Sequence, residues 1–148
     1  MAVNRGIDEE LFAKLTKNIY NRPFHKMLGM ELLEVGPGNV SILMRAEDKL
    51  LNHLSILHGG AIASLCDVAM GMAVMSLGIV SATVEMKVNY LAPGKKGRDI
   101  VAKGKVIKKG DTLIVAEAEL VSEGKLIVKS TGTYYKLNGS VSKVTGDN

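Results

Sequence analysis

The chain has 148 residues, of which 47% are hydrophobic and 23% charged, and its formal net charge is +4. A chain of this size buries about two-thirds of its unfolded surface, which predicts one domain over residues 1–137 and excludes disorder over most of the length. Its one cysteine, Cys66, excludes an intramolecular disulfide and favours a reducing compartment. The start MAVNRGID has no apolar leader, so we expect a cytoplasmic protein.

The first half of the chain predicts a short helix, a β-hairpin and a long buried helix. Asp8 can cap a helix over residues 9–20, and Pro23 ends it. Two apolar runs on either side of the turn sequence GPG predict a hairpin over residues 30–46. Residues 58–77 are small or apolar on every side of a helix, so other elements must wrap around it. The acid, the histidine and the glycines in this run argue against a membrane span.

The second half predicts strands, because the hydrophobic period changes from about 3.6 to 2 after Gly78. In the first of these strands, alternation puts Val84 on the apolar face and Thr83 on the polar face. Four strands in succession predict an antiparallel meander, and with the hairpin they make an α+β fold. In this fold a curved sheet of about five or six strands wraps the one long helix. The strands are expected at residues 82–90, 99–109, 112–120 and 126–136, followed by a disordered tail at 138–148.

An acid and a pair of glycines interrupt the apolar helix. Free N–H groups at a helix start, near Gly59 and Gly60, can hold an oxyanion, and Asp67 can act as a base or nucleophile, as acyl transfer requires. Asp67 lies about 12 Å along the helix from Gly59, too far for both to act on one carbonyl. Because exposed sheet edges are commonly paired, we expect an edge-to-edge homodimer, in which Gly59 of one chain can meet Asp67 of the other. The alternatives are tight packing for the glycines, a capping role for His58 and an ion pair with a lysine for Asp67.

The order Asn52, His58-Gly59-Gly60 and Asp67, followed by the strand TVEMKVNYLAPGKKG, resembles a known family. It is similar to the hot-dog-fold acyl-CoA thioesterases of the phenylacetate-pathway and thioesterase superfamily member 2 type. The resemblance runs from PFHKMLGMELLEVGPGNV to GKLIVKSTGTYY, and departs from the family at Ser55, where a glycine is usual. It implies hydrolysis of acyl-CoA to a carboxylic acid and coenzyme A, no separate cofactor, and a homodimer assembled into a homotetramer.

The resemblance also implies a role for each residue of the motif. Asp67 corresponds to the general base or nucleophile, and the Gly59 amide to the oxyanion donor. Asn52 corresponds to the residue that orients the water or the thioester, and His58 to one that shapes the loop and can bind the substrate carbonyl. Thr83 matches a small hydroxyl residue that lies beside the acid.

Basic residues gather between positions 87 and 109, where solvated strand faces are the alternative interpretation. The resemblance assigns this segment to the phosphates of coenzyme A. Its single aromatic residue and the lack of a known motif exclude nucleic acid as the expected partner. The expected substrate contacts are Gly60, Ser64, Tyr90, Lys95, Lys96, Arg98, Lys108 and Lys109, with Ser64 included for its place one turn before the acid.

The sequence predicts no metal site, because His25, His53 and His58 lack paired ligand spacing and no CxxC or HExxH motif occurs. A non-catalytic acyl-CoA sensor on the same fold is the alternative function, although a sensor needs no base. A hydratase of this fold would need a histidine paired with an acid in a different motif. The acyl group is left open, since it depends on which side chains line the tunnel among Leu65, Val68, Met70, Met72 and Met75.

Overall fold

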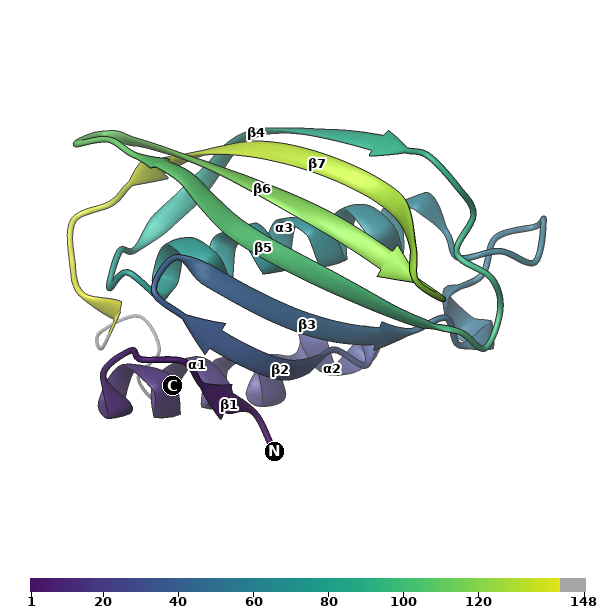
Figure 1. Cartoon of the computed structure of the whole chain (residues 1–148), viewed down its shortest axis with the longest axis horizontal. Coiled ribbons are helices and arrows are strands. Elements are labelled where there is room, and N and C mark those ends of the chain that lie inside the picture. The colour runs from purple at the N-terminus through teal and green to yellow at the C-terminus, as the bar shows by residue number, and fades with distance from the viewer. Residues whose placement is uncertain (142–148) are drawn as a thin grey trace.

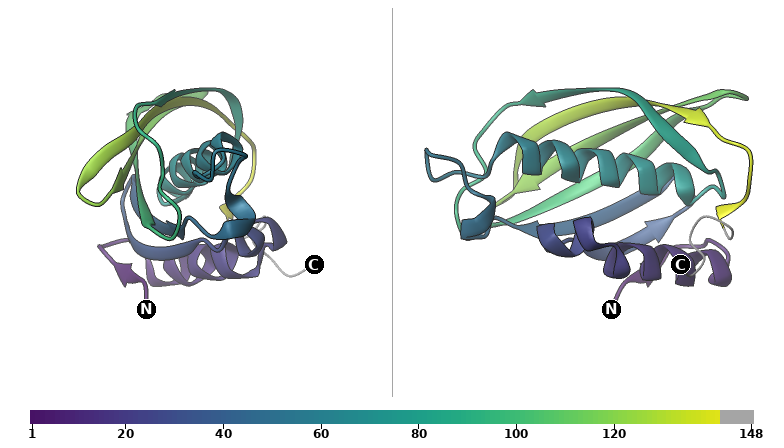
Figure 2. Two further views of the ribbon diagram at one scale, coloured as in Figure 1. Left: turned by 90° about the vertical axis from the view of Figure 1, so that its right-hand side faces the viewer. Right: turned by 180° about the vertical axis from the view of Figure 1, so that it is seen from behind.

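Seven strands form one sheet, which curves around a single central helix, as Figure 1 and the end-on view in Figure 2 show. The computed structural model describes residues 1–141. The predicted α+β arrangement is confirmed, with an extra two-residue strand at the N-terminus that is too short to predict. In chain order the elements are β1 (Val3–Asn4), α1 (Glu9–Asn21), α2 (Pro23–Leu28), β2 (Glu31–Gly36), β3 (Asn39–Arg45), a short 3-10 helix (Asp48–Leu50), α3 (Gly59–Met75), β4 (Ser81–Tyr90), β5 (Asp99–Lys109), β6 (Leu113–Ser122) and β7 (Lys125–Lys136).

The strand order is β1-β2-β3-β5-β6-β7-β4, so the predicted four-strand meander is wrong at its first strand. Strands β5, β6 and β7 do form a meander, but β4 pairs with β7 at the far edge of the sheet. The connection from β4 to β5 is too long for a tight hairpin turn. It crosses beneath the start of α3, where the Leu57 N–H donates to the Gly94 carbonyl at 2.8 Å. Strand β4 is therefore an edge strand.

The N-terminal segment forms two helices where one was predicted. The Asp8 carboxylate caps α1 by accepting from the Leu11 N–H at 3.0 Å, as predicted. Pro23 does not simply end this helix, because it occupies the first turn of α2, where its missing N–H has no cost. Both helices lie along the β1–β3 end of the sheet (Figure 2).

Small side chains on the inner face of the sheet allow α3 to approach closely. A Cβ atom added to Gly104 would lie 2.2 Å from the backbone carbonyl oxygen of Ala69 on α3. At Gly132 an added Cβ would lie 3.1 Å from both Met70 and Tyr134. The other small buried residues on this face, which leave room for the helix, are Ala102, Ala116, Ala118 and Ser130. The apolar helix predicted from sequence is thus set deep in the sheet.

The C-terminal end of the domain extends past the predicted boundary at residue 137. Val141 is 3% exposed and belongs to the hydrophobic core. The rest of the predicted tail, residues 142–148, lies outside the described residues. Among the described helices, none has the length and apolar character that a membrane span requires.

We expect Gly104→Ala to lower the free energy of unfolding by about 3 kcal/mol or more, because the added methyl group would displace the backbone of α3. Urea denaturation measures this change. Lys103→Ala, on the outer face of the same strand, is the control and should change stability by less than about 0.5 kcal/mol. Equal stability of the Gly104→Ala variant and the wild type would contradict the close packing of α3.

Candidate active site

Asp67 lies on α3, and its half-buried carboxylate faces β7 and β4, which are neighbours at one edge of the sheet. Its Oδ1 atom accepts a hydrogen bond from Thr83 Oγ1 at 2.8 Å and another from the Tyr134 hydroxyl at 3.2 Å. Its other oxygen, Oδ2, has no hydrogen-bond donor among residues 1–141. The carboxylate is therefore held through one oxygen and free at the other.

A β-bulge in β4 turns Thr83 toward the acid. The register with β7 shifts between Thr83 and Glu85, which inserts one extra residue at Val84. The simple alternation predicted for this strand is therefore wrong before the bulge, because Thr83 lies on the same inner face as Met86. Val84, predicted to face the core, is 58% exposed.

The start of α3 presents one free backbone donor. His58 caps the helix, and its Nδ1 atom accepts from the Gly60 N–H at 2.8 Å, which occupies that amide. The Gly59 N–H finds no acceptor among the described residues. The Gly59 carbonyl accepts from the Tyr90 hydroxyl at 3.0 Å. The exposed donor thus belongs to Gly59 rather than to Gly60.

The loop before α3 is shaped by Asn52. Its side-chain oxygen accepts from the Leu54 N–H at 2.9 Å and the Ile56 N–H at 3.4 Å, and within the described part of the chain its NH₂ group has no acceptor. Ser55 adopts a φ of 58°, a left-handed conformation that favours glycine. The serine therefore keeps the turn that glycine would make, at a conformational cost.

These residues line two separate cavities in the protomer. Asn52, Gly59 and Tyr90 line a cavity of about 500 Å³ at the start of α3. Asp67, Thr83 and Tyr134 line a second cavity of about 190 Å³, whose apolar wall comes from the second half of α3. The predicted oxyanion donor and the predicted acid thus face different spaces within one chain.

Several predicted contacts lie away from both cavities or already have partners. The Ser64 hydroxyl donates to the Gly60 carbonyl at 2.8 Å, as serines inside helices commonly do. Lys95 and Arg98 approach Glu123, at 3.8 Å and 3.4 Å, and Lys96 pairs with Asp48 at 2.9 Å. Lys95, Lys96 and Arg98 belong to the loop before β5, which we call the basic loop. The other two predicted phosphate contacts, Lys108 and Lys109, lie at the opposite end of β5.

Cys66 is not placed to act as a nucleophile, because its side chain is fully buried and lines neither cavity. Burial raises the pKa of the Cys66 thiol to about 12, and the charge of the neighbouring Asp67 adds to the effect. Burial also raises the pKa of Tyr134, so its phenol stays protonated and donates to the acid. Among residues 1–141 no group of three or more potential ligands could hold a metal ion.

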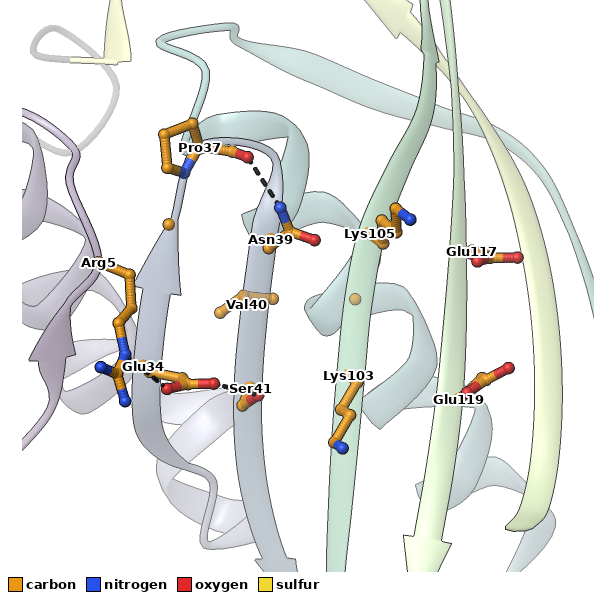
Figure 3. A pocket seen from close by; sticks show the side chains of 12 residues that line it. Arg5, Glu34, Pro37, Asn39, Val40, Ser41, Lys103, Lys105, Glu117 and Glu119 are labelled. Carbon is orange, nitrogen blue, oxygen red and sulfur yellow. Dashed lines mark hydrogen bonds and ion pairs between the residues drawn. The ribbon is translucent and has the colours of Figure 1, made fainter.

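Another hollow, of about 530 Å³, lies on the outer face of the sheet and contains none of the predicted site residues (Figure 3). Four of its six charged side chains, Arg5, Glu34, Glu117 and Glu119, already have partners. Arg5 pairs with Glu34 at 2.9 Å, and Lys129 bridges Glu117 and Glu119 at 2.8 Å each. We therefore place the active site on the inner side of the sheet.

Comparison with known proteins shows the family to which the chain belongs. The model of the thioesterase superfamily matches residues 54–129, a range that includes the HGG sequence, Asp67 and Thr83. Human acyl-coenzyme A thioesterase 13 is 35% identical over 117 residues, which cover 76% of this chain and 84% of the relative. The chain belongs to the thioesterase superfamily.

Solved structures in this superfamily include two informative neighbours. The PaaI protein of Escherichia coli, from the phenylacetic acid degradation operon, has the same fold, with a TM-score of 0.86, 23% identity and coverage of 91% of this chain and 99% of its own. A Streptococcus pneumoniae thioesterase solved with coenzyme A has a TM-score of 0.71 and 28% identity, covering 73% of this chain and 85% of its own. That thioesterase has also been solved with an aspartate, or a threonine 16 positions later, replaced by alanine.

Sequence reasoning missed three residues of the candidate site. Tyr134 contacts the acid, and Asn18 and His25 line the same cavity from α1 and α2. Burial lowers the pKa of His25, which favours its neutral form, and its Nδ1 atom is buried without a hydrogen-bond partner in the described structure. No local pattern marks these residues, because each reaches the site through long-range packing.

We expect Ser55→Gly to raise the free energy of unfolding by about 0.5 to 1 kcal/mol, because glycine adopts the left-handed conformation without steric cost. Thermal and urea unfolding measure the change, and Ser55→Ala, which keeps the Cβ atom, is the control. A glycine variant no more stable than the alanine variant would show that Ser55 carries no conformational cost.

Proposed function

We propose that the protein hydrolyses acyl-CoA thioesters to a carboxylic acid and coenzyme A. Two groups carry this proposal: the Asp67 carboxylate, which is held through Oδ1, and the N–H of Gly59 at the start of a helix. Within residues 1–141, Asp67 Oδ2 has no donor and the Gly59 N–H has no acceptor. The names of the human and streptococcal relatives support the proposal. The aspartate and threonine replaced in the streptococcal thioesterase have the separation of Asp67 and Thr83, which is 16 positions.

Each group has a defined task in this reaction. Asp67 Oδ2 either removes a proton from the attacking water or attacks the thioester carbonyl itself, forming an anhydride that water then opens. In both routes the carbonyl oxygen becomes negatively charged, and the Gly59 N–H stabilises it at the positive end of the helix dipole. The coenzyme A thiolate leaves and takes up a proton. Single turnover in ¹⁸O-labelled water separates the routes, because only the anhydride route puts label into Asp67.

We propose a homodimer in which each active site takes its acid from one chain and its oxyanion donor from the other. Two exposed features support this assembly. Strand β4 is an edge strand with exposed apolar residues, including Val84 at 58% and Tyr90 at 54%. One side of α3 is only partly covered in the protomer, at Ala63, Ser64, Asp67, Val68, Gly71 and Met75. A second copy placed along β4 would cover both features.

Coenzyme A would bind at the start of α3. Asn52 and Tyr90 line the larger cavity there, and the basic loop adjoins it through the bridge between Ile56 and Lys95. In the proposed dimer, this basic loop of one chain approaches Asp67 of the other chain. Lys109 of that other chain lies at the same level of the sheet as Tyr134, because the two residues are in register across β6. The two basic clusters would thus meet across the interface. The homotetramer and the cytoplasmic location stay predictions.

We expect Asp67→Asn and Gly59→Pro each to lower kcat by about 10² to 10³-fold. Proline suits the first position of a helix, where it removes the N–H and adds a ring, and His58 already has the extended conformation, with a ψ of 135°, that precedes proline. Initial rates with acetyl-, hexanoyl-, palmitoyl- and phenylacetyl-CoA measure the loss.

Gly59→Ala is the matched control for the proline variant, because it adds a methyl group and keeps the N–H. Its Cβ atom would be 3.5 Å from the Tyr90 ring, an ordinary contact. Circular dichroism checks that all variants are folded. Binding of these esters without turnover by the wild type would instead support the acyl-CoA sensor.

A heterodimer tests whether the site is shared. Co-expression of differently tagged Asp67→Asn and Gly59→Pro chains yields a heterodimer that, with shared sites, has one intact site and about half the wild-type activity. Sites built within one chain would leave it as inactive as its parents. In the reciprocal control, one wild-type chain pairs with a chain carrying both substitutions, and here the shared arrangement predicts an inactive heterodimer.

A further inference from the structure

Tyr134 closes the inner side of the Asp67 carboxylate. Its side chain is 2% exposed, and it lies on β7 directly opposite Thr83 of β4. The tyrosine hydroxyl is 3.2 Å from both Oδ1 and the backbone carbonyl oxygen of Asp67. The phenol thus contacts the acid where no solvent reaches its ring.

The packing around the tyrosine ring leaves the hydroxyl little freedom. A Cβ atom added to Gly132 would lie 3.1 Å from the ring, and one added to Gly71 would lie 3.8 Å from it. The ring is therefore confined between the sheet and α3. Because burial and the Asp67 charge both raise its pKa, the hydroxyl keeps its proton and acts as a donor at every pH where the enzyme would work.

Two donors on one carboxylate oxygen have a chemical consequence. Two hydrogen bonds from different strands to one carboxylate oxygen fix the plane of the group. Thr83 supplies the shorter bond from an edge strand, whereas Tyr134 supplies one from the interior. With Oδ1 held in this way, Oδ2 is the oxygen left for the substrate.

We propose that Tyr134 is a positioning residue, which acts with Thr83 to fix the orientation of the Asp67 carboxylate and to direct its Oδ2 atom at the thioester. This inference rests on the proposed function for its catalytic meaning. It does not make Tyr134 a catalytic residue, because its hydroxyl contacts the acid rather than the reacting atoms. Its contribution belongs to the rate of the chemical step more than to substrate binding.

The test compares Tyr134→Phe with Tyr135→Phe. The first change removes the hydroxyl and keeps the buried ring, and the second removes a hydroxyl from an adjacent side chain that is 47% exposed. We expect Tyr134→Phe to lower kcat by about ten- to a hundred-fold with KM within about threefold, because the change disorients the acid and leaves substrate binding intact. Tyr135→Phe should change neither quantity.

Thr83 provides an independent check on the same oxygen. Thr83→Val should lower kcat with KM nearly unchanged, as Tyr134→Phe does, and Thr83→Ser should restore kcat, because serine returns the hydroxyl group. The variant with both donors removed should show the largest loss of kcat. If Tyr134→Phe leaves kcat unchanged, or raises KM as much as it lowers kcat, the hydroxyl does not position the acid and the inference is overturned.

A second readout does not need turnover. Crystal structures should show the Asp67 carboxylate reoriented or disordered in Tyr134→Phe, and in its wild-type orientation in Tyr135→Phe. An unchanged carboxylate in Tyr134→Phe would overturn the inference even in an active enzyme. A reoriented carboxylate in a protein that hydrolyses none of the four acyl-CoA esters would uphold the contact and reject the proposed function instead.

Discussion

The close approach of α3 to the inner face of the sheet is the constraint on which the rest of the structure depends. Gly104 allows the backbones of β5 and α3 to touch, and small residues on β6 and β7 continue the groove. A helix with this many apolar side chains cannot face water, so the sheet must bend around it. The position of the candidate site depends on this close approach, because it brings Asp67 on α3 within hydrogen-bond distance of hydroxyl groups on β4 and β7.

Depth also explains how an acid is tolerated in the middle of an apolar helix. Transfer of a carboxylate out of water costs several kcal/mol unless hydrogen bonds replace its hydration. Here the sheet supplies two donors to one oxygen, while the edge position of β4 leaves the other oxygen accessible. The edge strand β4 carries both Thr83, which binds the carboxylate, and exposed apolar side chains. The candidate acid therefore lies next to the proposed dimer surface.

The sequence predicts the local elements closely and the long-range pairings poorly. The cap at Asp8, the hairpin, the central helix and the span of β5 at residues 99–109 follow from periodicity and turn chemistry. The edge position of β4 does not, because strand order depends on contacts between distant segments. The bulge at Val84 reverses the predicted facing of Thr83, which only the family resemblance placed beside the acid. Tyr134 looks like any aromatic residue in a strand until β7 is placed under α3.

The rigidity of α3 sets the geometry of a shared site. A helix fixes the separation of Gly59 and Asp67 at about 12 Å, which no side-chain rotation can close within one chain. In the proposed homodimer, a two-fold axis between the two α3 helices would overcome this separation, because each helix would give its start to one site and its middle to the other. The half-covered side of α3 and the unpaired edge of β4 then have a single explanation. Neither is a defect of the fold, since the second chain that completes the chemistry would also complete the core.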